Sequence, residues 1–317
     1  MRKNIPFIYG LINNLEEVVI IFSIEVVLAP KLSFYQLIIP RDVFEDMNDS
    51  PGESIIIGAH FNGEPIGIVI AKIQSSQFYA NLHYIHVRSK FRRFGIGNNL
   101  LKELEQNLLE KDCKKIYSWY LYHEYSRDLE AFFYSCGFNT LTTDMLYYQT
   151  CITRNDNNAP LFRRSELPPD FSIFLWSDLT DAERKIIQEG ENFWYPDNLS
   201  PLINEIEYKT SIGLRFQGEV VGWMITKITP FQTLEYATLF IQERFQKLGV
   251  GITLIVKAIE LQQSELCEVP IMNFRVASKN QNMLAIVEHK LGKYLELEKK
   301  ERKRVTKQLI KLGVERT

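Results

Sequence analysis

The stretch VRSKFRRFGIG, from Val87 to Gly97, decides the fold, because it returns as IQERFQKLGVG, from Ile241 to Gly251, at an offset of 154 residues (241 − 87). Each copy follows a strand-like run of apolar residues and precedes leucines or isoleucines at helical spacing. Each is therefore predicted to join the end of a strand to the start of a helix. The first helical turn offers free N–H groups and a positive dipole end, and glycines let a ligand approach the backbone, so such a loop favours a phosphate.

A second repeat lies upstream of each glycine loop. FNGEPIGIVIAKI, from Phe61 to Ile73, reappears as FQGEVVGWMITKI, from Phe216 to Ile228, at an offset of 155 residues (216 − 61). Asn-Gly and Gln-Gly between apolar, β-branched runs predict a β-hairpin in each copy. Because the order and spacing of both repeats are kept, the two halves of the chain are duplicates.

The domain organisation follows from the length and the duplication. A chain of 317 residues predicts two domains. Each half reads as a hairpin, a strand, a glycine loop, a helix, a further strand and a shorter helix, which predicts an α/β (α+β layered) fold with a mixed central sheet flanked by helices. We place the N-terminal domain at residues 1–150, a linker rich in Asn and Pro at 151–170, and the C-terminal domain at 171–317.

The composition limits the classes of partner. A net charge of -2 and a pI near 6.3 predict no general attraction to nucleic acid, and Glu298 and Glu301 interrupt the basic cluster at 299–304, which reads as a solvated strand or helix face. The four cysteines show no metal-ligand spacing, so we expect a cytoplasmic protein without a metal. The apolar run from Val18 to Ala29 is too short to span a membrane and predicts a buried strand or helix. The oligomeric state stays open.

Both glycine loops resemble a known signature. The pattern V-x-x-x-x-R/Q-x-x-G-x-G after a strand is similar to the acetyl-CoA signature of the GNAT superfamily of N-acetyltransferases, with Ile241 in place of the valine in the second half. The third glycine of a dinucleotide-binding loop is missing from both copies. The resemblance implies a tandem two-domain member that uses acetyl-CoA or another acyl-CoA, with the pyrophosphate on the loop amides and the pantetheine arm along the strand. It implies contacts from Ile85, Val87, Arg92, Arg93, Phe94, Gly95, Ile96, Gly97, Leu239, Ile241, Gln246, Lys247, Leu248, Gly249, Val250 and Gly251.

The implied reaction is transfer of an acetyl or longer acyl group to a primary amine of a small molecule or peptide, by direct attack in a ternary complex. It needs a base for the ammonium proton, an acid for the leaving thiolate and donors for the oxyanion. Strand alternation predicts that Asn81, His83, Ile85 and Val87 share one face, and His83 alone among them titrates. The resemblance puts a base four or six residues before the valine position, which gives His83 in the first half and Glu235 in the second. A polar residue at a sheet edge without a catalytic role is the alternative for both.

The general acid is harder to assign. The resemblance implies a tyrosine four residues before a Gly-Phe pair, but Phe133 occupies that position and Tyr134 follows it; the second half has Glu288 there. Tyr134 is therefore a candidate acid or a core aromatic. We favour the first half as the catalyst. An acyl-CoA-binding module without turnover is the alternative function, whereas an aminoacyl-tRNA-dependent transferase is disfavoured by the charge balance and by two intact loops.

Overall fold

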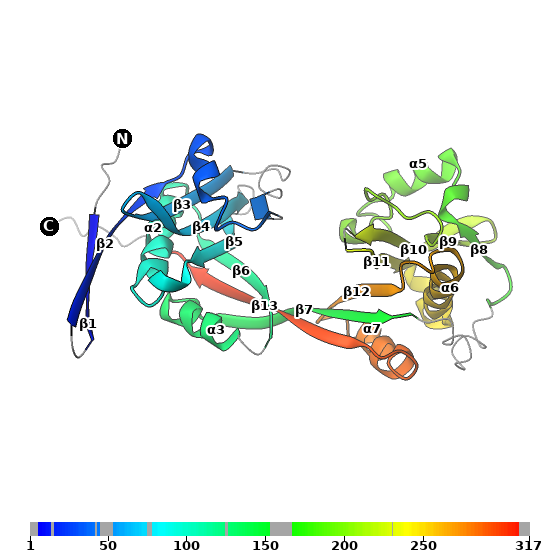
Figure 1. Cartoon of the computed structure of the whole chain (residues 1–317). Helices are drawn as coiled ribbons and strands as arrows, with labels where there is room; N and C mark the ends of the chain where they lie inside the picture. Colours follow the sequence, from blue (N-terminus) through cyan, green and yellow to red (C-terminus); the bar gives the residue numbers. More distant parts are fainter. Residues whose placement is uncertain are drawn as a thin grey trace. The chain divides into compact units, whose positions relative to one another are not determined.

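The computed structural model describes residues 6–13, 16–41, 43–44, 53–74, 78–123, 126–152, 167–229 and 231–310 (Figure 1). The chain forms two compact units: Met1–Thr142 together with Lys303–Thr317, and Thr143–Arg302. Most of the expected linker at 151–170 lies outside the described residues.

The first unit is built on a mixed sheet in the order β1-β2-β3-β4-β5-β6-β13. Neighbouring strands from β1 to β5 pair antiparallel, and β5 pairs in parallel with β6. Helices α2 and α3 cover one face, and a 3-10 helix covers the other with Leu32 and Tyr35. The elements in chain order are β1 (Pro6–Asn13), β2 (Glu16–Val26), the 3-10 helix (Ala29–Tyr35), β3 (Glu53–Phe61), β4 (Glu64–Gln74), β5 (Tyr79–Val87), a 3-10 turn (Ser89–Phe91), α2 (Ile96–Glu110), β6 (Lys115–Leu121) and α3 (Ser126–Ser135).

The second unit repeats this plan with the sheet order β7-β12-β11-β10-β9-β8. Helix α6 packs on one face, and Ile187 of α5 joins an aromatic cluster on the other. The predicted mixed sheet flanked by helices is confirmed. The elements are β7 (Thr140–Cys151), β8 (Phe171–Leu175), α5 (Asp181–Glu189), β9 (Ile212–Phe216), β10 (Glu219–Thr229), β11 (Thr233–Ile241), α6 (Val250–Glu265), β12 (Ile271–Ala277), α7 (Gln281–Ile286) and β13 (Glu298–Gln308), with 3-10 turns at Trp176–Asp178, Asp197–Leu199 and Glu243–Leu248 and a π-helical turn at Val287–Leu291.

Both predicted hairpins are present. Asn62 and Gly63 connect β3 to β4 with φ angles of 51° and 79°, and Gln217 and Gly218 connect β9 to β10 with 51° and 89°. Two consecutive positive φ angles define the turn that matches the twist of paired strands, and glycine adopts the second without strain. The repeat at the sequence level is therefore a repeat of local geometry.

The last strand of each repeat is exchanged. Strand β7 follows α3 in the chain, but its residues Met145–Cys151 pair antiparallel with β12 of the second unit. Strand β13 follows α7, but from Lys303 onward it belongs to the first unit (Figure 1). There the Asn139 N–H donates to the Thr306 carbonyl at 3.1 Å, and the Leu309 N–H donates to the Lys114 carbonyl at 2.8 Å. Each unit is thus completed by a strand from the other repeat.

The basic cluster at 299–304 lies in β13, and its cations have local partners. In the second unit Arg302 makes two bonds to the Asp144 carboxylate, at 2.9 and 3.0 Å, and Lys299 lies 3.5 Å from Glu288. In the first unit the Arg304 guanidinium lies over the Tyr117 ring. These interactions hold the exchanged strand in place.

An ion pair beneath α5 makes the stability of the second unit pH-dependent. Arg215 donates to both oxygens of Glu183, at 2.7 and 2.9 Å, and its bonds, with those from Thr180, lower the pKa of Glu183 from 4.5 to about 2. Because the folded pKa lies below the unfolded value, this stabilisation is present above about pH 5 and is lost as the pH falls towards 2. We expect the free energy of unfolding to drop by roughly 2 kcal/mol over that range in the native chain and by much less in Glu183→Gln, measured by urea denaturation.

Candidate functional site

The glycine loop of the first unit has an open backbone. Gly95 is the N-cap of α2 with φ 72°, and Arg93 has φ 69°. A non-glycine residue in the left-handed region is uncommon and concentrates at binding sites, where such turns direct successive N–H groups to one point. The Arg92 Nε donates to the Val87 carbonyl at 3.0 Å and fixes the strand end. The loop therefore presents amides and cations together.

The glycine loop of the second unit differs. Gly249 caps α6 with φ 81°, but Lys247 and Leu248 belong to the preceding 3-10 helix rather than to an open turn. The Gln246 amide donates to the Ile241 carbonyl at 2.9 Å, so Gln246 and Arg92 fix their strand ends in the same way. The first loop carries four cations and no acid at 88–93, whereas the second carries two cations and one acid at 242–247. The first loop therefore carries the higher positive charge.

A groove of about 680 Å³ runs along the first loop. Strand β5, the loop, the start of α2 and the helix α3 form its walls. Phe94 does not line it and packs instead against the core of the first unit. The groove brings together seven of the eight residues predicted to contact the cofactor in this half. Its lining consists of Ile85, His86, Val87, Phe91, Arg92, Arg93, Gly95, Ile96, Gly97, Asn98, Asp128, Leu129, Ala131, Phe132 and Ser135.

A β-bulge interrupts β5 at His83. The register with β4 passes from Leu82 to Tyr84, and the parallel register with β6 ends at Leu82. The predicted common face of Asn81, His83, Ile85 and Val87 is wrong, because the bulge reverses the alternation: Leu82 and Ile85 pack in the same core cluster, and Tyr84 packs in the other. The backbone of His83 thus lies outside both registers, where β5 and β6 diverge, and its side chain is exposed.

The second unit has the same bulge with a different residue. The register of β11 with β10 passes from Tyr236 to Thr238, and the pairing with β12 ends at Tyr236. Ala237 is therefore the structural counterpart of His83. Glu235 lies two residues earlier, where Lys227 Nζ is 3.3 Å and an Arg275 nitrogen 3.8 Å from its carboxylate. Glu235 therefore lies beside two cations in the second unit.

Two neighbouring aromatic residues of α3 differ in burial. Phe133, at the position expected for a tyrosine acid, is buried against Phe138, with ring centroids 4.9 Å apart. The Tyr134 side chain is 64% exposed and does not line the groove. Neither residue brings a phenol into the groove, so the sequence pattern for the acid has no counterpart there.

His86 is a groove residue, although the strand alternation expected from His83 would put it on the opposite face of β5. Its ring stacks on Tyr84, with centroids 6.1 Å apart, and it also lines the groove. Burial, together with Arg92 and Arg88, lowers the pKa of His86, so its imidazole is neutral at pH 7. Residues of α3 such as Phe132 and Ser135 were also missed, because only the tertiary packing brings α3 over the loop.

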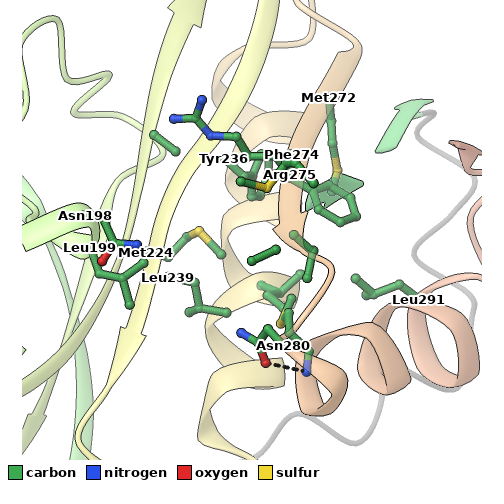
Figure 2. Close-up of a pocket in the computed structure, with 16 residues that line it drawn as sticks. Asn198, Leu199, Met224, Tyr236, Leu239, Met272, Phe274, Arg275, Asn280 and Leu291 are labelled. Carbon is green, nitrogen blue, oxygen red and sulfur yellow. Dashed lines mark hydrogen bonds between the residues drawn. The ribbon is translucent and has the colours of Figure 1, made fainter. Parts of the chain in front are cut away.

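The second unit contains its own cavity of about 250 Å³, where β11 and β12 diverge (Figure 2). Leu239 lines it, but the loop residues from Gln246 to Gly251 do not.

Across the described residues we find no group of three or more His, Cys, Asp or Glu side chains arranged to hold a metal. In the same part of the chain, no helix combines the length and apolar character needed to cross a membrane.

Comparison with known proteins agrees with this geometry. Residues 25–138 match the family model of the acetyltransferase (GNAT) family. The fold is similar to that of a tandem GNAT protein from the clavulanic acid biosynthesis pathway, with a TM-score of 0.65, 13% identity, and coverage of 92% of this chain and 100% of that one. It is also similar to a GCN5-related N-acetyltransferase from Sphaerobacter thermophilus, with a TM-score of 0.60, 12% identity, and coverage of 92% and 96%.

No curated protein matches the chain by sequence. The family match covers β3 to β6, the glycine loop, α2 and α3 of the first unit, and the structural similarity covers 92% of the chain. Residues 25–138 thus match the acetyltransferase (GNAT) family model, and the chain has a fold similar to that of a tandem GNAT protein.

Proposed function

We propose that the chain is an acyl-CoA-dependent N-acyltransferase whose first unit binds the donor and performs the transfer to a primary amine. The observation that carries the proposal is the groove of the first unit, which joins the cationic glycine loop to the end of β5. Loop amides, Arg92 and Arg93 suit a pyrophosphate, and the apolar walls from Ile85, Val87 and Phe132 suit the pantetheine arm. The donor set fits the ligand that the family uses.

His83 is our candidate general base. It sits at the bulge where β5 and β6 diverge, and its counterpart in the second unit is Ala237, which cannot titrate. The imidazole would take one ammonium proton, the free amine would attack the thioester carbon, and the C–S bond would break as the extra nitrogen proton passes to the departing thiolate. A bulge also frees backbone polar groups from the ladder, so the strand itself can supply a donor to the oxyanion.

The test is the release of free thiol from acetyl-CoA in the presence of a panel of primary amines. We expect His83→Ala to lower kcat by about 10²- to 10⁴-fold with little change in acetyl-CoA affinity, because a general base acts on the chemical step. Glu235→Gln is the matched control and should keep near-native kcat. Loss of turnover in Glu235→Gln with full turnover in His83→Ala would move the chemistry to the second unit.

A binding module without turnover is the second candidate function. It is favoured by Phe133, which fills the expected acid position with a buried ring. The thiol-release assay separates the two functions directly. Tight acetyl-CoA binding without thiol release for any amine would support the module and reject the enzyme.

A further inference from the structure

An aromatic shelf, formed by Tyr79, Tyr117 and Trp119, lies on the sheet of the first unit. The Tyr79 and Tyr117 rings meet edge to face with centroids 5.0 Å apart, and the Tyr117 and Trp119 rings stack at 6.2 Å. Their neighbours Ala80 and Ile116 pack in the core with α2, so strand alternation directs the shelf to the opposite face of the sheet. All three rings are half-buried and therefore keep part of their surface accessible.

Two buried polar atoms lie beside the aromatic shelf. The Arg304 guanidinium is 5.8 Å from the Tyr117 centroid, and among the described residues its Nε has no hydrogen-bond acceptor. Asn81 lies in register with Tyr117 across β5 and β6, and its Oδ1 finds no donor in the same part of the chain. Most buried polar atoms of native proteins are paired, because an unpaired one is costly. A ligand with one acceptor and one donor would satisfy both atoms.

The second unit fills the equivalent positions with ion pairs. Glu235 occupies the place of Asn81, at an offset of 154 residues (235 − 81), and its carboxylate lies 3.3 Å from Lys227 and 3.8 Å from Arg275. Polar residues also replace the three rings: in the order Tyr79, Tyr117 and Trp119, the counterparts are Thr233, Asn273 and Arg275. The aromatic shelf and the two unpaired atoms are thus features of the first unit.

These groups define the chemistry of a ligand. A guanidinium binds a carboxylate strongly, an amide oxygen accepts from an ammonium group, and aromatic faces hold another ring. His83 follows Asn81 by two residues, at the point where β5 and β6 diverge. An ammonium group at Asn81 therefore lies next to the candidate base along β5.

We propose that the aromatic shelf is the acceptor site of the first unit and that the acceptor is a primary amine with a carboxylate and an aromatic ring, as in an aromatic amino acid. The carboxylate binds Arg304, the ammonium group binds Asn81, and the ring lies on the shelf. This assignment rests on the acyl transfer proposed above. Transfer forms a C–N bond as the thioester C–S bond breaks, and the nitrogen gives one proton to His83 and one to the thiolate.

Arg304 gives the exchanged strand a role in the substrate site. It lies in β13, which follows α7 in the chain but belongs to the first unit from Lys303 onward. The second repeat thus supplies the group that recognises the carboxylate, and the first repeat supplies the shelf and the base.

The experiment is calorimetric titration of the full chain, without acyl-CoA, with three amines: L-phenylalanine, phenethylamine, which lacks the carboxylate, and L-alanine, which lacks the ring. Phenethylamine should bind about tenfold to hundredfold more weakly than phenylalanine, the loss expected for a hydrogen bond between charged groups. Alanine should bind weaker by about tenfold or more, because no ring is buried. Absence of phenylalanine binding, or equal affinity for phenylalanine and either analogue, overturns the proposal.

A pair of variants tests the carboxylate contact. Arg304→Met keeps the side chain's length and removes its charge, so phenylalanine affinity should fall to that of phenethylamine while phenethylamine affinity stays the same. Lys303→Met is the matched control, because it removes the adjacent cation of β13, which lies over Tyr122. It should leave both affinities at native values. Equal losses for the two ligands in Arg304→Met, or equal behaviour of the two variants, would contradict the role of Arg304.

A third variant tests the shelf independently of the exchanged strand. Trp119→Leu should weaken phenylalanine and phenethylamine by a similar factor of about tenfold, since both lose the ring contact, and should leave alanine unchanged. An unchanged preference for phenylalanine over alanine in this variant would reject the shelf as the ring's binding surface.

Thiol release from acetyl-CoA with phenylalanine separates this proposal from the proposed function. If phenylalanine binds in an Arg304-dependent manner but no amine releases thiol, acyl transfer is rejected and the amino-acid site stands. If other amines release thiol while phenylalanine neither binds nor reacts, acyl transfer stands and this acceptor class is rejected.

Discussion

A chain that ends at Arg302 is expected to lose the first unit while keeping the second folded. The missing segment supplies the final strand of the first sheet and buries Val305 in its core. Lys307 also inserts between the Glu105 carboxylate and the Cys136 carbonyl. A buried valine contributes about 1.5 kcal/mol or more, and each lost backbone hydrogen bond about 1 kcal/mol. Their sum approaches the whole stability of a typical domain.

Differential scanning calorimetry measures this outcome. The full chain should show the transitions of both units, and the truncated chain should retain only the transition of Thr143–Arg302. A synthetic peptide covering residues 298–310, added in excess, should restore the lost transition and acetyl-CoA binding. Native-like melting of the first unit without the strand would mean that β13 is dispensable there.

Another large effect is expected from a substitution of Gly97, the second residue of α2. A Cβ at Gly97 would lie 2.9 Å from the Cε2 atom of Phe132, whereas a Cβ at Gly251 would meet nothing nearer than Ile241, at 3.7 Å. Gly97→Val therefore pushes Phe132 into the groove and adds bulk to its wall. We expect acetyl-CoA affinity to fall about tenfold to hundredfold, the cost of overpacking, as measured by titration calorimetry.

Gly251→Val is the matched control, because it makes the same change at the same position of the other loop. It should leave both acetyl-CoA affinity and thiol release near native values. In the double variant Gly97→Val with Phe132→Leu, part of the affinity should return, since the smaller side chain relieves the clash. If Gly251→Val proves the more damaging change, the donor binds in the second unit.

The parts of the site that depend on local sequence were predictable. The glycine loops, the hairpin turns and the helices after the loops follow from residues that are neighbours in the chain, and the structure has all of them. Gly95 and Gly249 take the left-handed conformation that their positions require. The resemblance to the GNAT superfamily was based on the glycine loops, and residues of the first loop line the groove.

The bulges at His83 and Ala237 were beyond the sequence pattern. A period-two argument assumes an unbroken ladder, and one extra residue reverses the face of everything after it. His86 was misplaced in consequence, although it lines the groove. The sequence of β5 gives no sign of the bulge, because the extra residue, His83, is polar and an unbroken strand could also carry a polar residue at that position.

The exchange of β7 and β13 between the two units could not be predicted from the sequence either. Alternation tells which face of a strand is buried but carries no information on which strand lies next to it. The basic residues of β13 suggested a solvated face, whereas Arg302 and Lys307 hold local acids in both units. Only tertiary pairing assigns such a strand to its sheet.

This exchange sets an order of events during biosynthesis. The ribosome delivers α2 and β6 long before Lys303–Gln308, so the first unit, although made first, must wait for the last strand to leave the exit tunnel. Contacts such as Asn139–Thr306 and Lys114–Leu309 are among the most distant in sequence, and distant contacts slow folding. The nascent first half therefore carries an unpaired sheet edge through most of translation. Such an edge is open to chaperones and to pairing with strands of neighbouring chains.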